Sequence, residues 1–141
     1  RDQVSMERLE MPSRDRSRLS KYQPLGRWIR NEKRLAIYLR DNFKCLFCGK
    51  DLAGEVANIT LDHIITKSAG GDNEPTNIFT ACRSCNSSRQ DLLLERFATG
   101  DRIDRIQAQV NVDLAPYFKQ AKAILDGKSF EKVLRVVKRG R

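Results

Sequence analysis

The sequence predicts a small α+β fold, with a core of two short strands and a helix and with further helices on both sides. The chain has 141 residues, which suits one small domain with extensions and excludes a two-domain enzyme with a large cofactor fold. Its four cysteines form two pairs with two-residue spacers, and β-branched segments precede the second pair. In the segments before and after the cysteine region, apolar residues recur at the spacing of a helix.

The net charge of the chain is +9, and it is unevenly distributed. Residues 1–30 carry a charge of +4, residues 31–100 are neutral, and residues 101–141 carry +5. All four cysteines and the single histidine lie in the neutral centre, which indicates a chemical unit between two basic arms. Such arms favour a polyanionic partner, nucleic acid before an anionic membrane surface. With no segment resembling a membrane span or signal peptide, we expect a soluble, cytoplasmic protein.

The first third of the chain predicts a tail followed by a helix. Residues 1–22 show no sustained hydrophobic period and carry alternate arginines at positions 14, 16 and 18, which predicts a flexible basic tail. From Pro24, helical spacing of apolar residues predicts a helix that ends near Arg40. These apolar residues are Leu25, Trp28, Ile29, Leu35, Ala36 and Leu39.

The centre predicts two strands, each following a turn. Residues 45–48 fit a tight turn, and the β-branched segment 56–66 predicts a strand. Turn-forming residues over 70–75 predict a loop, after which Ile78 and Phe79 begin a second short strand.

The remaining residues predict helices only. One helix is expected over about 84–98, ended by Gly100, and three further helical patterns follow, with Pro116 tolerated in a first turn. These three helices are expected to belong to the core or to form a lid over the central unit. Their apolar positions are Ile103, Ile106, Val110, Leu114, Phe118, Ala121, Leu125, Phe130, Val133, Leu134 and Val137.

The paired cysteines predict a structural zinc site. Cys45 and Cys48, and Cys82 and Cys85, have the spacing that lets two thiolates of one turn reach the same tetrahedral ion. Two disulfides or four unrelated thiols are the alternatives, but disulfides are rare in intracellular proteins. A site closed by four sulfurs has no open position for chemistry, so the zinc would serve the fold.

Several motifs lie around the single histidine in a fixed order. His63 follows Asp62 directly, Asn77 follows the loop, and Asn86 comes immediately after the last cysteine. In this order, residues 40–89 resemble the HNH nucleases, also called ββα-metal nucleases, in their four-cysteine version. The matching motifs are Arg40, Cys45-x-x-Cys48-Gly49, Leu61-Asp62-His63-Ile64, Gly70-Gly71, Asn77-Ile78, Cys82-x-x-Cys85-Asn86 and Arg89.

This resemblance implies a ββα core around one divalent cation, with a separate structural zinc. It implies His63 as general base, Asp62 and Asn86 as ligands of the catalytic cation, and Asn77 as the residue that fixes the loop and orients the histidine strand. Histidine titrates near neutral pH and suits the deprotonation of water, while oxygen ligands favour Mg²⁺, with Mn²⁺ as a substitute. Asn86 stands where many members carry His, which leaves the metal preference open.

The function that the resemblance implies is a metal-dependent DNA endonuclease, which nicks duplex DNA or cuts both strands. A zinc-stabilised DNA-binding module without catalysis is one alternative, and a structural subunit is another. In these alternatives Asp62 would be an exposed strand-end carboxylate, and Asn77 and Asn86 would be ordinary turn and cap residues. We expect a bacterial or phage-encoded protein with DNA as partner, a homodimer if both strands are cut, and partner proteins of a phage or mobile element.

Basic residues near these motifs are candidate phosphate contacts or solvated surface charges. They are Lys67, Arg83 and Arg89 near the motifs, and Arg14, Arg16, Arg18, Lys138, Arg139 and Arg141 in the flanks. The expected organisation is a tail over 1–22, a nuclease domain with its N-terminal helix over 23–99, and a basic helical extension over 100–141.

Overall fold

The computed structural model describes residues 29–137. The chain divides into two units, residues 1–30 and residues 31–141. The expected tail, the helix residues before position 29 and the basic run over 138–141 therefore lie outside the described residues. Within the described part, no helix is long and apolar enough to cross a membrane.

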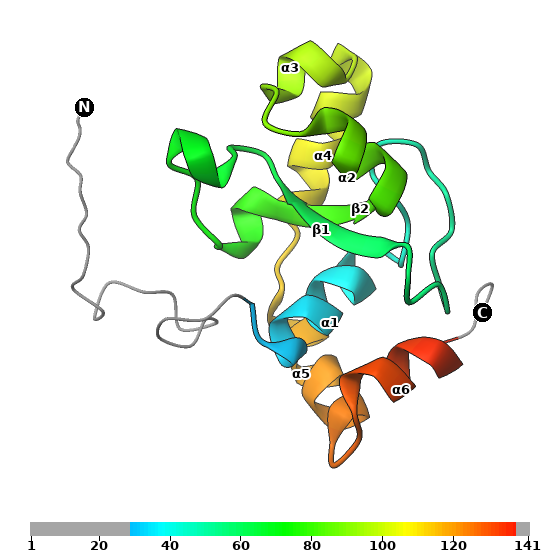
Figure 1. Cartoon of the computed structure of the whole chain (residues 1–141). Helices are drawn as coiled ribbons and strands as arrows, with labels where there is room; N and C mark the ends of the chain where they lie inside the picture. The colour runs from blue at the N-terminus through cyan, green and yellow to red at the C-terminus, as the bar shows by residue number, and fades with distance from the viewer. Residues whose placement is uncertain (1–28, 138–141) are drawn as a thin grey trace. The chain divides into compact units, whose positions relative to one another are not determined.

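A two-stranded antiparallel sheet lies at the centre of the second unit, which confirms the α+β class. Strand β1 (Ile59–His63) pairs with β2 (Ile78–Cys82), and every residue of β2 is buried. Strand β1 is shorter than the strand predicted over 56–66. It begins only at Ile59, because the N–H groups of Asn58 and Ile59 donate to the carbonyl of Glu55 and close a turn there. Figure 1 shows the two strands between α2 and α4 on one side and α1 on the other.

Helix α1 (Asn31–Arg40) packs against both β2 and α5 (Ala115–Leu125). Its end at Arg40 is as predicted, but it begins only at Asn31, since Ile29 and Arg30 precede it as irregular backbone. Its side chains from Leu35 to Tyr38 are fully buried. This helix therefore forms one wall of the core beneath the sheet.

The prediction of a single helix over 84–98 is wrong, because this segment forms two separate helices. Helix α2 (Arg83–Arg89) follows β2 directly and ends at Gln90, whose φ of 52° cannot continue a right-handed helix. A short helix α3 (Leu94–Phe97) follows. Gly100 starts α4 (Gly100–Val110) instead of ending a helix, because Thr99 caps the new helix by accepting a bond from the Arg102 N–H.

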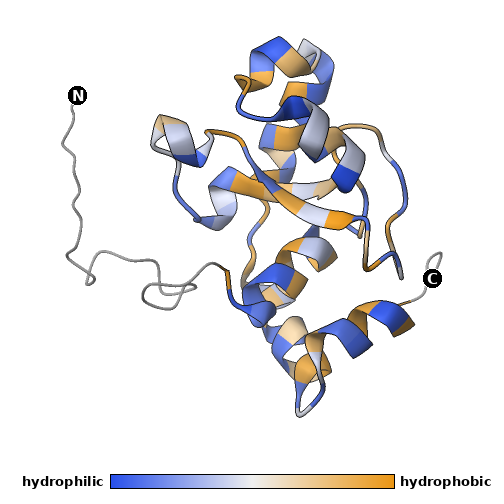
Figure 2. Cartoon of the chain, in the orientation of Figure 1, coloured by the Kyte–Doolittle hydropathy of each residue, from blue (hydrophilic) through white to orange (hydrophobic). Residues whose placement is uncertain are grey.

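The three C-terminal helices are present as predicted and belong to the core. Helix α4 packs against β2, α5 packs along α1, and α6 (Phe130–Val136) packs against α5. Ile106 and Ala121 are fully buried, and the ring of Phe130 stacks on that of Tyr38 at 6.5 Å. Figure 2 shows these helices with hydrophobic and hydrophilic residues mixed along each, as expected of helices that bury one face.

Candidate metal centres and catalytic residues

The four cysteines converge at one end of the sheet. Cys45 and Cys48 lie in the turn after α1, Cys82 ends β2, and Cys85 lies in the first turn of α2. Their four sulfurs all lie within 4.8 Å of one another, and the Sγ atoms of Cys48 and Cys82 are 4.0 Å apart. Zn–S bonds of about 2.3 Å in a tetrahedron place sulfurs about 3.8 Å apart, so the cluster fits one zinc ion.

Both cysteine pairs have the same local geometry. The N–H of Cys48 donates to Cys45 Sγ, and the N–H of Cys85 donates to Cys82 Sγ, each at 3.4 Å. Gly49 closes the first turn with φ of 82°, a conformation that favours glycine. The local sequence thus shapes two turns that each present two sulfurs.

The chemistry of the thiols also suits a cation. Burial raises the pKa of the Cys45 and Cys85 thiols. Burial acts in the same direction on Cys82, but hydrogen bonds from the Cys85 N–H and the neighbouring thiols outweigh it and lower its pKa. All four cysteines are free thiols, so the disulfide alternative is not formed. A zinc ion binds thiolates and would offset the cost of burying them.

The opposite end of the sheet carries Asp62 and His63, which are 6% and 8% exposed. Asp62 Oδ1 accepts a bond from the His63 N–H at 2.7 Å. Its other oxygen, Oδ2, lies 3.2 Å from the guanidinium of Arg89 and has no hydrogen-bond partner among the described residues. Burial raises the pKa of this carboxyl, although the charge of Arg89 opposes the effect. A buried carboxylate oxygen whose printed partner is one guanidinium still has lone pairs that could bind a hard cation.

Asn86 approaches the same strand from α2. Its Nδ2 donates to Thr60 Oγ1 and to the carbonyl of Leu61, both at 3.0 Å. Thr60 Oγ1 in turn donates to the carbonyl of Ala81, which leaves its lone pairs to accept from Asn86. Both bonds use the amide nitrogen, so within residues 29–137 the amide oxygen is left to act as a second oxygen ligand. Asn86 therefore fits the ligand role beside Asp62.

Asn77 holds the loop that joins the strands. Its Oδ1 accepts from the N–H of Ile65, and its Nδ2 donates to the carbonyls of Ile65 and Asp72 at 3.0 and 2.8 Å. Gly71 lies in the same loop, and a Cβ there would stand 1.7 Å from the carbonyl oxygen of Ile65. Only glycine allows this close approach, which brings the loop back against the end of β1.

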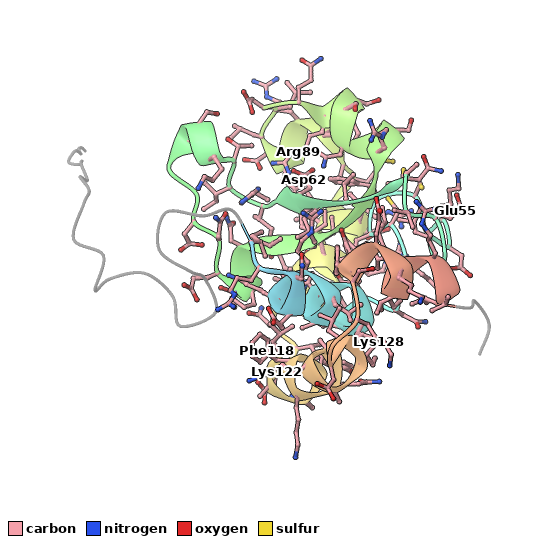
Figure 3. The ribbon with its side chains drawn as sticks, turned by 60° about the horizontal axis from the view of Figure 1, so that its bottom comes forward. Glu55, Asp62, Arg89, Phe118, Lys122 and Lys128 are labelled. Carbon is pink, nitrogen blue, oxygen red and sulfur yellow. The ribbon has the colours of Figure 1, made fainter. Side chains whose placement is uncertain are left out.

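Arg89 is placed differently from its prediction as a surface phosphate contact. Its side chain is fully buried, and its guanidinium donates to the backbone carbonyls of His63, Ile64 and Leu92 as well as pairing with Asp62. Figure 3 shows Asp62 and Arg89 next to each other inside the fold. This arrangement corrects the prediction, because Arg89 holds the end of β1 and offers nothing to an external phosphate. Lys67 and Arg83 are exposed.

Two contributors to the site were not predicted from the sequence. Asn73 Oδ1 lies 2.8 Å from His63 Nε2, and Asn73 is only 4% exposed. Lys33, on α1, is fully buried and donates to the backbone carbonyl of Asn73. Burial lowers the pKa of Lys33 to about 8, although Glu74 and Asp72 oppose the effect. The sequence marks Asn73 only as a turn former, so it offers no signal for this contact.

One comparison with known proteins finds a match over part of the chain. Residues 45–99 match a family model described as HNH endonuclease. The matched segment contains both cysteine pairs, both strands and helices α2 and α3, and so it includes each of the site residues Asp62, His63, Asn77 and Asn86. No curated protein and no solved structure matches the chain.

Proposed function

Because residues 45–99 match the HNH endonuclease family, we propose that this chain is a metal-dependent DNA endonuclease that hydrolyses phosphodiester bonds. One observation carries the proposal beyond the family match. A buried carboxylate oxygen of Asp62 without a hydrogen bond lies next to Arg89, directly before the single histidine and on the strand that Asn86 contacts. This oxygen is ion-paired with Arg89 at 3.2 Å, but one guanidinium leaves it lone pairs that a metal cation can bind.

Asp62 and Asn86 would hold the catalytic cation, with Mg²⁺ preferred for these oxygen donors and Mn²⁺ as a substitute. When bound, such a cation stabilises negative charge on the phosphate and on the departing oxygen. The role of His63 is to accept a proton from the attacking water. This set of residues differs in chemistry from the four thiols, so we assign the two ions to separate sites.

The surrounding residues keep this set in place. Arg89 binds the carbonyls of His63 and Ile64, which fixes the backbone at the end of β1. Asn77 closes the loop against Ile65. With the side chains of the site held by packing and hydrogen bonds, little reorganisation is needed when the substrate binds.

The proposal also predicts which residues contact the DNA substrate. Lys67 and Arg83 are exposed and are the candidate contacts for the phosphate backbone of DNA. Backbone contacts give affinity but little sequence information, so we expect cleavage with weak sequence preference from this domain. The chain has a single histidine and so one such site, and cleavage of both strands at one position would favour two chains acting together.

The test is the cleavage of supercoiled plasmid by the zinc-loaded chain with Mg²⁺, with and without a chelator. We expect relaxation by the wild type, loss of at least about 100-fold in rate in His63→Ala with DNA binding retained, and normal activity in the exposed control Lys128→Ala. Equal cleavage by His63→Ala would reject His63 as the base. Binding of DNA by the wild type without cleavage under any divalent cation would instead identify a DNA-binding module without catalysis.

A further inference from the structure

The four sulfurs of the cysteine cluster differ in their access to solvent. Cys48 is exposed and Cys85 is partly exposed, whereas Cys45 and Cys82 are only 1% and 5% exposed. A Cβ built at Gly49, the residue after Cys48, would meet no atom beyond its chain neighbours within 4 Å, so this turn borders open space. Cys48 is therefore the member of the cluster that a small solute reaches most easily.

The sulfurs also differ in the hydrogen bonds that they accept from the backbone. Cys45 Sγ accepts from the Cys48 N–H and Cys82 Sγ accepts from the Cys85 N–H, each at 3.4 Å. Across residues 29–137, no backbone N–H donates to Cys48 Sγ. An N–H bond draws electron density from a sulfur that binds metal and lowers its reactivity. Exposure and hydrogen bonding thus single out the same sulfur as the reactive one.

A second sulfur lies close to Cys48 from a distant part of the chain. The Sγ atoms of Cys48 and Cys82 are 4.0 Å apart, although 34 positions separate the two residues. Cysteines that respond to oxidants are accessible to solvent and lie beside a second thiol that resolves the first oxidation product. Exposed Cys48 and buried Cys82 have this arrangement.

We propose that Cys48 is a site of oxidation by peroxides, that Cys82 is its resolving thiol, and that their disulfide releases the zinc bound by the cluster. This inference concerns the cysteine end of the sheet and goes beyond the proposed endonuclease function. It does not depend on any role of Asp62, His63 or Asn86.

The reaction has two steps. The Cys48 sulfur attacks one oxygen of hydrogen peroxide, the O–O bond breaks, and a sulfenic acid forms at Cys48 while hydroxide leaves. The Cys82 sulfur then attacks the Cys48 sulfur, an S–S bond forms, and the S–O bond breaks to release a second hydroxide. Each of the two thiolates loses one electron, and one peroxide with two protons from solvent becomes two water molecules.

The disulfide removes two of the four zinc ligands at once. Only the thiolates of Cys45 and Cys85 remain, whereas a structural zinc site needs four ligands. The site therefore loses its affinity for zinc, and the fold loses the stability that zinc binding supplies. A thiol reductant breaks the disulfide again and restores all four ligands.

The experiment treats the full, zinc-loaded chain with hydrogen peroxide. A chromogenic chelator measures the zinc released, and mass spectrometry maps the disulfides after the remaining thiols are alkylated. Cleavage after Phe47 and Arg83 places the four cysteines on different peptides. We expect one zinc released for each Cys48–Cys82 disulfide formed, and renewed zinc binding after reduction with dithiothreitol. Retention of zinc while a free thiol in the same solution is oxidised would overturn the proposal, and so would a first disulfide between any other pair.

Variants that keep four ligands test Cys48 itself. Cys48→His supplies an imidazole, which zinc accepts in Cys₃His sites, and removes the sulfur that reacts with peroxide. We expect it to release zinc at least about 10-fold more slowly than the wild type. The matched control Cys85→His makes the same change but keeps Cys48 and Cys82, so its release rate should stay within about threefold of the wild type.

The two measurements answer separate questions. A folded Cys48→His protein that releases zinc as fast as the wild type would overturn the role of Cys48. If Cys48→His does not fold, the disulfide map of the wild type decides alone, because it identifies both reacting sulfurs. Neither reading involves DNA, so the failure of the proposed endonuclease function would leave this proposal standing, and the reverse also holds.

Discussion

The two ends of the small sheet hold their chemical groups in different ways. At one end, paired with Ile59, Cys82 joins three other cysteines whose sulfurs come from two tight turns. At the other end, about 14 Å away for a five-residue strand, Asp62 and His63 depend on a buried arginine, an asparagine and a loop. The cysteine end is set by spacing within short segments, whereas the histidine end is set by contacts between distant ones.

Removing the metal from the cysteine end should have the largest effect. We expect about one zinc per chain, and loss of the folded state when a strong chelator removes it or when Cys85→Ser weakens the site. Zinc sites of this kind supply about 10–16 kcal/mol of apparent binding free energy, which matches the whole stability of a small domain. Far-UV circular dichroism and metal analysis measure this, with the exposed neighbour variant Ser84→Ala as control. A folded, metal-free chain with four titratable thiols would contradict it.

Breaking the histidine end should destabilise the protein but spare the zinc. In Arg89→Met, the carboxylate of Asp62 loses its cation, and the carbonyls of His63 and Ile64 lose their donors. We expect a loss of about 3–5 kcal/mol in the free energy of unfolding by urea, with zinc content unchanged.

The control for Arg89→Met is Arg96→Met, which removes an exposed arginine of α3. A double variant with Asp62→Asn should recover part of the lost stability, because it removes the unpaired charge. An Arg89→Met protein as stable as the control would show that the buried guanidinium has no net role in the fold.

The buried lysine beside this end gives a pH-dependent effect of smaller size. Burial lowers the pKa of Lys33 to about 8, against 10.5 for a lysine in water. Between these values the unfolded chain binds more protons than the folded one, so the free energy of unfolding should rise with pH. We expect a rise of about 1–2 kcal/mol from pH 8 to pH 10 in the wild type relative to Lys33→Met, measured by urea unfolding. Lys128→Met should follow the wild type, and an equal slope in Lys33→Met would remove Lys33 as the cause.

The smallest expected effect concerns DNA contacts near the two ends. If Arg83 contacts a phosphate, Arg83→Ala should reduce the slope of log Kd against log salt by about 1 on any sequence. Lys122→Ala removes the same charge from α5, where the ammonium lies 5.7 Å from the Phe118 ring, and Figure 3 shows both residues away from Asp62 and Arg89. Fluorescence anisotropy measures the slopes, with His63→Ala as background because the proposed role of His63 as the base makes this variant inactive. Equal slopes for the two variants would remove Arg83 from the interface.

The cysteine end could be predicted from the sequence almost completely. The two-residue spacing within each pair determines which sulfurs share a turn. The second pair follows directly after the second predicted strand, and the first pair lies in the predicted first turn. The match to the HNH endonuclease family confirms the resemblance over residues 45–99. In the histidine end, the roles of Asp62, His63, Asn77 and Asn86 came from that resemblance and stay predictions.

The rest could not be predicted, because it depends on contacts made only in three dimensions. A basic residue after the last cysteine fits a surface role as well as a buried one, and only the packing of α2 on β1 shows that Arg89 is inside. Lys33 and Asn73 are 40 positions apart, so no periodicity links them. The helix over 84–98 was mispredicted because a single residue, Gln90, turns to positive φ where apolar spacing continues.

Helix α2 spans the distance between the two ends with only seven residues. Cys85 near its start belongs to the sulfur cluster, Asn86 bonds to the middle of β1, and Arg89 at its close bonds to the final residues of that strand. One residue inserted between Cys85 and Arg89 would rotate the guanidinium by about 100° around the helix axis and carry it about 1.5 Å further along. The length of this one helix therefore sets how the sulfur cluster and the buried guanidinium are spaced along β1.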